Sequence, residues 1–155
     1  VNSFMTKAKI CGNYVNSIMA KKEVTAMGYD EAILLDTEGY VCEASGENIF
    51  IIKDGVLKTT PPTAILRGIT RDAVFAIARD KKMTVEEQRF TRDELYTADE
   101  AFFTGTAAEI TPVREVDNRA IGKGERGPVT AAIQSAFFDL VQGRDDRYRS
   151  WLTYL

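Results

Sequence analysis

Lysine, tyrosine and carboxylate side chains are the reactive groups of this chain, because its 155 residues include no histidine. That absence excludes Ser-His-Asp and Cys-His nucleophile pairs and removes the commonest transition-metal ligand. Lys9 stands three residues ahead of the step Gly12–Tyr14. Catalysis here must use lysine, tyrosine, carboxylates, backbone amides or a cofactor, and lysine can serve as both nucleophile and proton shuttle.

Two glycine-containing turns are suited to binding an anion. Gly68 precedes a predicted helix whose first amides have no intrahelical partners, and Thr70 adds a hydroxyl. Gly105 and Thr106 follow an apolar strand, where small residues allow a ligand to approach the backbone closely. Taken singly, each motif is also typical of a plain helix start or a tight turn. Two of them in a chain this short favour a bound phosphate.

Glu43 is an acidic residue inside the predicted strand 40–44. Strand alternation places it on the face opposite Tyr40 and Cys42, so it lies either on the solvent face or in the interior with a partner. A lysine, a carboxylate, a tyrosine and anion-binding turns together match the needs of pyridoxal phosphate. That cofactor requires a lysine, a phosphate site and an acid that keeps its ring nitrogen protonated, so that the ring acts as an electron sink.

The elements that position these groups follow from hydrophobic periodicity. Helices are predicted over 10–27, 69–82, 91–98 and 127–143. Strands are predicted over 31–36, 40–44, 48–53, 56–59, 84–90, 100–106 and 110–117. The pair Asp54-Gly55 predicts a two-residue hairpin, and 31–59 reads as an antiparallel meander. We therefore expect one α+β domain over 1–155, with a mostly antiparallel, barrel-like sheet and flanking helices.

Composition limits the possible partners. The net charge of −3 argues against a nucleic-acid partner, and no apolar run approaches the ~20 residues that cross a bilayer. Two cysteines, Cys11 and Cys42, form neither a disulfide framework nor a zinc set. We therefore expect no metal site, no membrane partner and a reducing, cytoplasmic compartment.

As a co-linear set the motifs resemble the branched-chain amino acid aminotransferases, class IV pyridoxal-phosphate enzymes of fold type IV. The resemblance runs along nearly the whole chain, through KICGNYVNS (9–17), GYDEAILLD (28–36), GYVCEASGENIFIIKDGVL (39–57), GITRD (68–72) and ELYTADEAFFTGTAAEITPV (94–113). It implies the larger, C-terminal domain of such an enzyme. The family's smaller N-terminal α/β domain, which supplies a phosphate-binding arginine, has no counterpart in these residues.

The resemblance also implies roles for individual residues. Lys9 matches the Schiff-base lysine, and Lys7 is taken as a solvated surface residue. Glu43 matches the carboxylate that pairs with the pyridinium nitrogen, and Tyr14 the tyrosine beside the cofactor and substrate. The remaining matches are Leu66 against the ring, Gly68, Ile69, Thr70 and Thr106 at the phosphate, and Thr106 with Ala107 at the substrate carboxylate.

The activity implied is transamination of Leu, Ile and Val with 2-oxoglutarate, in a homodimer or a larger assembly of dimers. Lys9 would move the proton between the substrate Cα and the cofactor C4′ carbon. D-amino acid aminotransferase and aminodeoxychorismate lyase are the alternatives within the same fold. A non-catalytic binding or assembly module is the alternative outside enzymes. Residues 1–155 alone are expected to bind cofactor weakly and to turn over very slowly or not at all.

Overall fold

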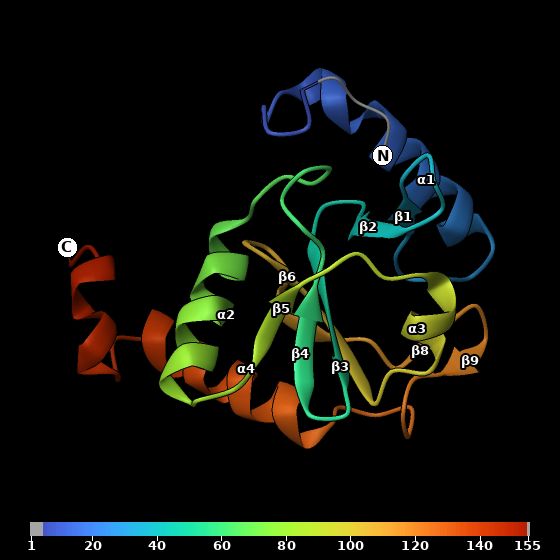
Figure 1. The fold of residues 1–155 in the computed structure, drawn as a ribbon. Helices are drawn as coiled ribbons and strands as arrows, with labels where there is room; N and C mark the ends of the chain where they lie inside the picture. The colour runs from blue at the N-terminus through green and yellow to red at the C-terminus, as the bar shows by residue number, and fades with distance from the viewer. Residues whose placement is uncertain (1–4, 155) are drawn as a thin grey trace.

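The computed structural model describes residues 5–154. Its helices are the 3-10 helix η1 (Cys11–Tyr14), α1 (Val15–Ala26), α2 (Ile69–Asp80), α3 (Arg92–Tyr96), α4 (Pro128–Val141) and the 3-10 helix η2 (Asp146–Trp151). Its strands are β1 (Ile33–Leu35), β2 (Val41–Ala44), β3 (Asn48–Lys53), β4 (Val56–Thr59), β5 (Val85–Glu87), β6 (Glu100–Gly105), β7 (Glu109–Pro112), β8 (Glu115–Val116) and β9 (Arg119–Ala120). Figure 1 shows η1 and α1 at one end of the molecule, next to the β1–β2 hairpin.

A five-stranded sheet in the order β5-β4-β3-β6-β7 forms the centre of the fold (Figure 1). Its strand pairs are antiparallel except for β4 with β5, which run parallel. The hairpin between β3 and β4 turns at Asp54 and Gly55, whose φ angles of 50° and 77° lie in the left-handed region. That geometry is what a two-residue Asp-Gly hairpin requires. The α+β class and the mostly antiparallel sheet are confirmed.

The central strand β3 is buried on both faces, which explains its unbroken apolar run. Phe50 and Ile52 pack with residues of α2 and α4. Ile49 and Ile51 face the opposite way, into a second cluster that includes Phe90. Because successive side chains of a strand point to opposite faces, one segment supplies both cores. The strands that carry the candidate site are therefore anchored from two sides.

The expected barrel-like closure is not confirmed among residues 5–154. β5 and β7 are the two edges of the central sheet, while β1–β2 and β8–β9 form separate two-stranded sheets. The predicted meander over 31–59 is consequently two hairpins in different sheets. The predicted strand over 110–117 is interrupted between β7 and β8, and the predicted helix over 10–27 begins as a 3-10 turn. Helices α2 and α4 pack against one face of the sheet.

Helix α1 carries apolar side chains that the rest of the described chain does not bury. Val15, Ile18 and Met19 are 61%, 54% and 62% exposed, and none of the helix's residues is buried. The predicted helix therefore forms, but its apolar side chains do not pack into the core of residues 5–154. In that same range we find no helix with the length and apolarity needed to cross a bilayer.

Candidate active site

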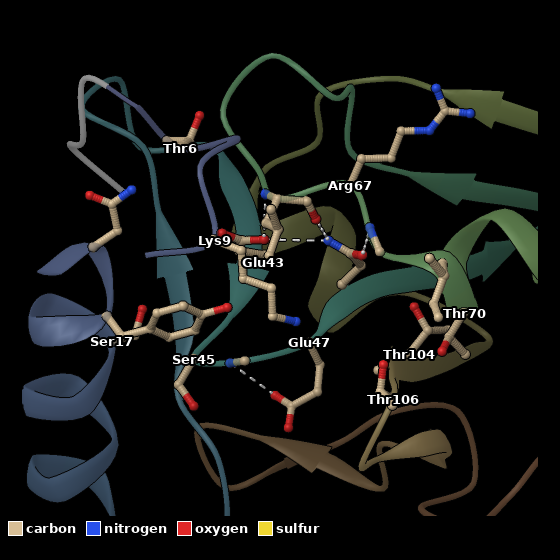
Figure 2. Close-up of a pocket in the computed structure, with 18 of the residues that line it drawn as sticks. Thr6, Lys9, Ser17, Glu43, Ser45, Glu47, Arg67, Thr70, Thr104 and Thr106 are labelled. Carbon is tan, nitrogen blue, oxygen red and sulfur yellow. Dashed lines mark hydrogen bonds between the residues drawn. The ribbon is translucent and has the colours of Figure 1, made fainter. Parts of the chain in front are cut away.

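One cavity of about 230 Å³ collects eight of the nine residues that the sequence assigned to the site. They come from the segment before α1, from β2, from the segment leading into α2 and from the end of β6 (Figure 2). These eight are Lys9, Tyr14, Glu43, Leu66, Gly68, Ile69, Thr70 and Thr106. Ala107 lies in the turn next to Thr106 and is exposed, outside the lining of this cavity.

Lys9 precedes η1 and its side chain reaches into the cavity beside Glu43 (Figure 2). Lys7 is exposed and is not part of the lining. The Asn13 side chain ties this segment together, because its Nδ2 donates to the carbonyls of Met5 (2.7 Å) and Ala8 (2.9 Å). The Gly-Asn-Tyr step therefore fixes the backbone from which Lys9 extends, a role that the sequence pattern did not assign to the asparagine.

Glu43 projects from β2 into the cavity, so the alternative of a solvent-facing carboxylate does not hold. Its Oε2 accepts hydrogen bonds from the Leu66 amide (3.1 Å) and from Asn48 Nδ2 (3.3 Å). Burial nevertheless raises the pKa of Glu43 from 4.5 to about 7, because losing water disfavours the charged form more than the amide of Leu66 favours it. The hydrogen-bond donors that these contacts give to the Glu43 carboxylate are therefore both neutral.

The start of α2 is the end of the cavity that is best suited to an anion. Gly68 is the N-cap in extended conformation (φ −83°, ψ 144°), and no side chain of the described residues caps the helix. The first amides of such a helix have no intrahelical acceptor and carry the positive end of the helix dipole. Thr70 is 4% exposed at this end, and Figure 2 shows it on the same side of the cavity as Thr106. The arrangement suits a bound anion.

Two cavity residues were not singled out by the sequence pattern. Asn48 is 3% exposed and bonds both Glu43 and the segment leading into α2. The sole hint was a polar residue opening an otherwise apolar strand. Glu47 contributes a second carboxyl group, whose pKa is raised by burial and by the neighbouring Glu31. Within residues 5–154, no group of three or more histidine, cysteine or acidic side chains is placed to hold a metal.

Residues 1–116 match the sequence profile of the amino-transferase class IV family. The chain therefore belongs to that family.

Within the family, the chain is similar to enzymes named branched-chain-amino-acid aminotransferase. It is 57% identical over 153 residues to the one from Pseudomonas aeruginosa, covering 99% of this chain and 50% of that protein. It is 49% identical over 152 residues to the one from Escherichia coli K12, covering 97% and 49%. A crystal structure of the T.th. branched-chain amino acid aminotransferase with pyridoxamine 5′-phosphate superimposes with a TM-score of 0.94 at 54% identity, over 96% of this chain and 49% of that one. The chain thus spans about half the length of these relatives.

Proposed function

We propose that residues 1–155 form the C-terminal, cofactor-binding domain of a pyridoxal 5′-phosphate-dependent aminotransferase that acts on Leu, Ile and Val with 2-oxoglutarate. The observation that carries this proposal is one cavity that holds a lysine, a largely buried carboxylate and an uncapped helix start. Relatives with the corresponding name, at 57% and 49% identity, support the substrate class. A cytoplasmic location and assembly as a dimer or a larger assembly of dimers belong to the same proposal.

The donor set of the cavity fits pyridoxal 5′-phosphate. The start of α2 and the hydroxyls of Thr70 and Thr106 offer donors to a phosphate, and Leu66 offers an apolar wall to a flat ring. Among the described residues, Glu43 has no cationic side chain as a hydrogen-bond partner, so a protonated ring nitrogen would complete it. When bound, the cofactor would supply an electron sink for the charge that develops at the substrate Cα.

Lys9 is the proton carrier of this mechanism. Its Nζ would hold the cofactor until the amino group of the substrate displaces it, and the freed amine would then take a proton from the substrate Cα and return it during the exchange of the amino group. Glu43 would hold the ring nitrogen of a bound cofactor protonated, since opposite charges in contact each favour the charged form. Tyr14 lies half-buried in the lining of the cavity, where its hydroxyl would orient bound groups.

The turn after β6 would receive the substrate carboxylate through the backbone amides of Thr106 and Ala107. β6 ends at Gly105, and a turn follows before β7 begins at Glu109. A side chain at Gly105 would press against Glu47, at 3.2 Å from its Cγ, so glycine lets the turn stay close to the cavity wall. Backbone amides bind a carboxylate whatever the side chain of the amino acid, so the preference for branched side chains has to come from other groups.

Covalent labelling tests the proposal. Borohydride reduction of the protein loaded with pyridoxal phosphate, followed by peptide mapping, should place the pyridoxyl group on Lys9. The matched control is Lys7→Ala, which should label as the unaltered protein does, while Lys9→Ala should not label. A label on Lys7 would refute the assignment.

Substrate class is tested with a panel of L- and D-amino acids and 2-oxoglutarate. L-leucine, L-isoleucine and L-valine should react and D-alanine should not; the reverse order would identify a D-amino acid aminotransferase. Release of pyruvate from aminodeoxychorismate would instead identify the lyase. Residues 1–155 by themselves should bind cofactor weakly and remain far below roughly 10 turnovers per second, the typical enzyme rate. A domain that reaches that rate alone would show that no further domain is needed.

A further inference from the structure

Asn48 sits at the point where the carboxylate of the cavity meets the segment that leads into α2. It opens β3, is 3% exposed, and uses both ends of its carboxamide. Its Nδ2 donates to the Leu66 carbonyl (2.9 Å) and to Oε2 of Glu43 (3.3 Å). Its Oδ1 accepts from the amide of Gly68 (3.1 Å). One buried side chain thus connects β2, β3 and the start of α2.

One further contact closes this connection into a ring, and Gly68 leaves room for it. The amide of Leu66 donates to the same Oε2 atom of Glu43 that Asn48 reaches (3.1 Å). A Cβ added at Gly68 would lie 2.6 Å from Asn48 Oδ1, which is too close for the carboxamide to keep its place. Glycine at position 68 therefore allows the backbone before α2 to approach the Asn48 side chain closely enough for this hydrogen bond. Figure 2 shows these hydrogen bonds between Glu43 and the start of α2.

We propose that Asn48 is a positioning residue, which locks the carboxylate of Glu43 and the Leu66–Gly68 segment into one rigid unit. This inference rests on the proposed function, in which Glu43 faces the ring nitrogen and the start of α2 receives the phosphate. A flat cofactor bound at both ends needs those two anchors at a fixed separation, and misplacement by about 1 Å can cost roughly 100-fold in rate. The carboxamide links the anchors directly.

An amide is the side chain that this place requires. It offers a donor toward Glu43 and the Leu66 carbonyl, and an acceptor toward the Gly68 amide. A carboxylate of the same shape keeps the acceptor but replaces the donor with a negative oxygen 2.9 Å from the Leu66 carbonyl oxygen and 3.3 Å from Oε2 of Glu43. Asn48→Asp therefore breaks the contacts with Glu43 and with the Leu66 carbonyl and keeps the acceptor for the Gly68 amide, while Asn48→Ala removes all three.

The test measures the titration of Glu43 by carbon NMR of the glutamate carboxyl groups, with Glu43→Gln used to assign its signal. The other charged groups that line the cavity are Lys9, Glu47 and Arg67, and they are the same in every variant. In Asn48→Asp the midpoint of Glu43 should rise by about one pH unit or more, because a like charge disfavours ionisation. The control Asn118→Asp makes the same chemical change at an exposed turn and should not move it.

Ligand binding tests the α2 end of the unit. Asn48→Asp should bind inorganic phosphate more weakly than the unaltered protein, because it keeps the Gly68 contact but loses the Leu66 contact and adds a negative charge. Asn48→Ala should bind both phosphate and pyridoxal phosphate about tenfold more weakly or worse, since buried partners lose their hydrogen bonds. An unchanged Glu43 midpoint in both variants would overturn the inference.

Two measurements separate the positioning role of Asn48 from the proposed function: whether the variants fold, and whether the unaltered protein binds pyridoxal phosphate. If Asn48→Asp fails to fold, the double variant Asn48→Asp/Glu43→Gln should fold, because the like-charged pair is gone; a double variant that also fails would overturn the positioning role. If the unaltered protein does not bind pyridoxal phosphate, the proposed function fails. The Glu43 titration then still decides whether Asn48 controls that carboxylate.

Discussion

Replacing Glu43 with glutamine in the cofactor-free protein should change how stability depends on pH. The folded protein raises the pKa of Glu43 from 4.5 to about 7, chiefly by burial. Between these two values the folded state keeps a proton that the unfolded chain has lost. The free energy of unfolding contributed by Glu43 is therefore fully present below about pH 4.5 and is lost as the pH rises through about 7.

The size of this loss follows from the two pKa values. Since one pKa unit corresponds to about 1.36 kcal/mol, the span from 4.5 to about 7 corresponds to about 3 kcal/mol. Glutamine has nearly the same shape and no charge, so Glu43→Gln should not show this loss. Compared with Glu43→Gln, the unaltered protein should lose about 3 kcal/mol of stability between these pH values.

Urea unfolding of both proteins at several pH values between about 4.5 and 8 provides the measurement. Other carboxyl groups with shifted pKa values, such as Glu31 and Glu47, are common to the two proteins and cancel in the difference. Adding pyridoxal phosphate should reverse the trend at neutral pH, because a positive ring nitrogen favours the ionised carboxylate. If the free energy of unfolding of the unaltered protein, relative to that of Glu43→Gln, stays flat or rises with pH, then Glu43 is not a desolvated carboxylate without a cationic partner.

Two further predictions concern the threonines of the proposed phosphate site and the packing at the start of α4. Thr70→Val and Thr106→Val should each weaken pyridoxal phosphate binding by about 1.5–3 kcal/mol, measured by absorbance titration, because each removes a hydroxyl donor to a charged acceptor; unchanged affinity in both would mean that these turns are only structural. Gly127→Ala should lower the free energy of unfolding by about 1–3 kcal/mol. Its added Cβ would overlap the carboxylate of Glu100, which accepts from the first amides of α4 at 2.7 and 3.0 Å. Gly46→Ala, with open space around it, is the control and should change stability by less than about 0.5 kcal/mol.

Local features of the structure could be predicted from the sequence because short-range physics sets them. The Asp54-Gly55 turn needs residues that tolerate positive φ, and the sequence supplies them at the right place. Gly68 precedes a periodic apolar segment, so the start of α2 and its free amides follow from a few neighbouring residues. The spacing to the Gly-Asn-Tyr step likewise distinguished Lys9, which lines the cavity, from Lys7, which does not; the role of Lys9 as the cofactor lysine stays a prediction.

Tertiary structure alone decided how these local pieces are used. The alternation of side chains along a strand predicts that Glu43 and Tyr40 lie on opposite faces of the strand. Which of these faces is buried depends on Leu66, which is 23 residues away along the chain. The open form of the sheet likewise depends on which strands pair over long range, since β5 and β7 end as its edges, and no strand pattern contains that information. Asn48 gains its role only when the start of α2 returns to β3, 18 to 20 residues further along the chain. Sequence patterns report the nearest neighbours of a residue, whereas the chemistry of this cavity depends on partners that only folding brings into contact.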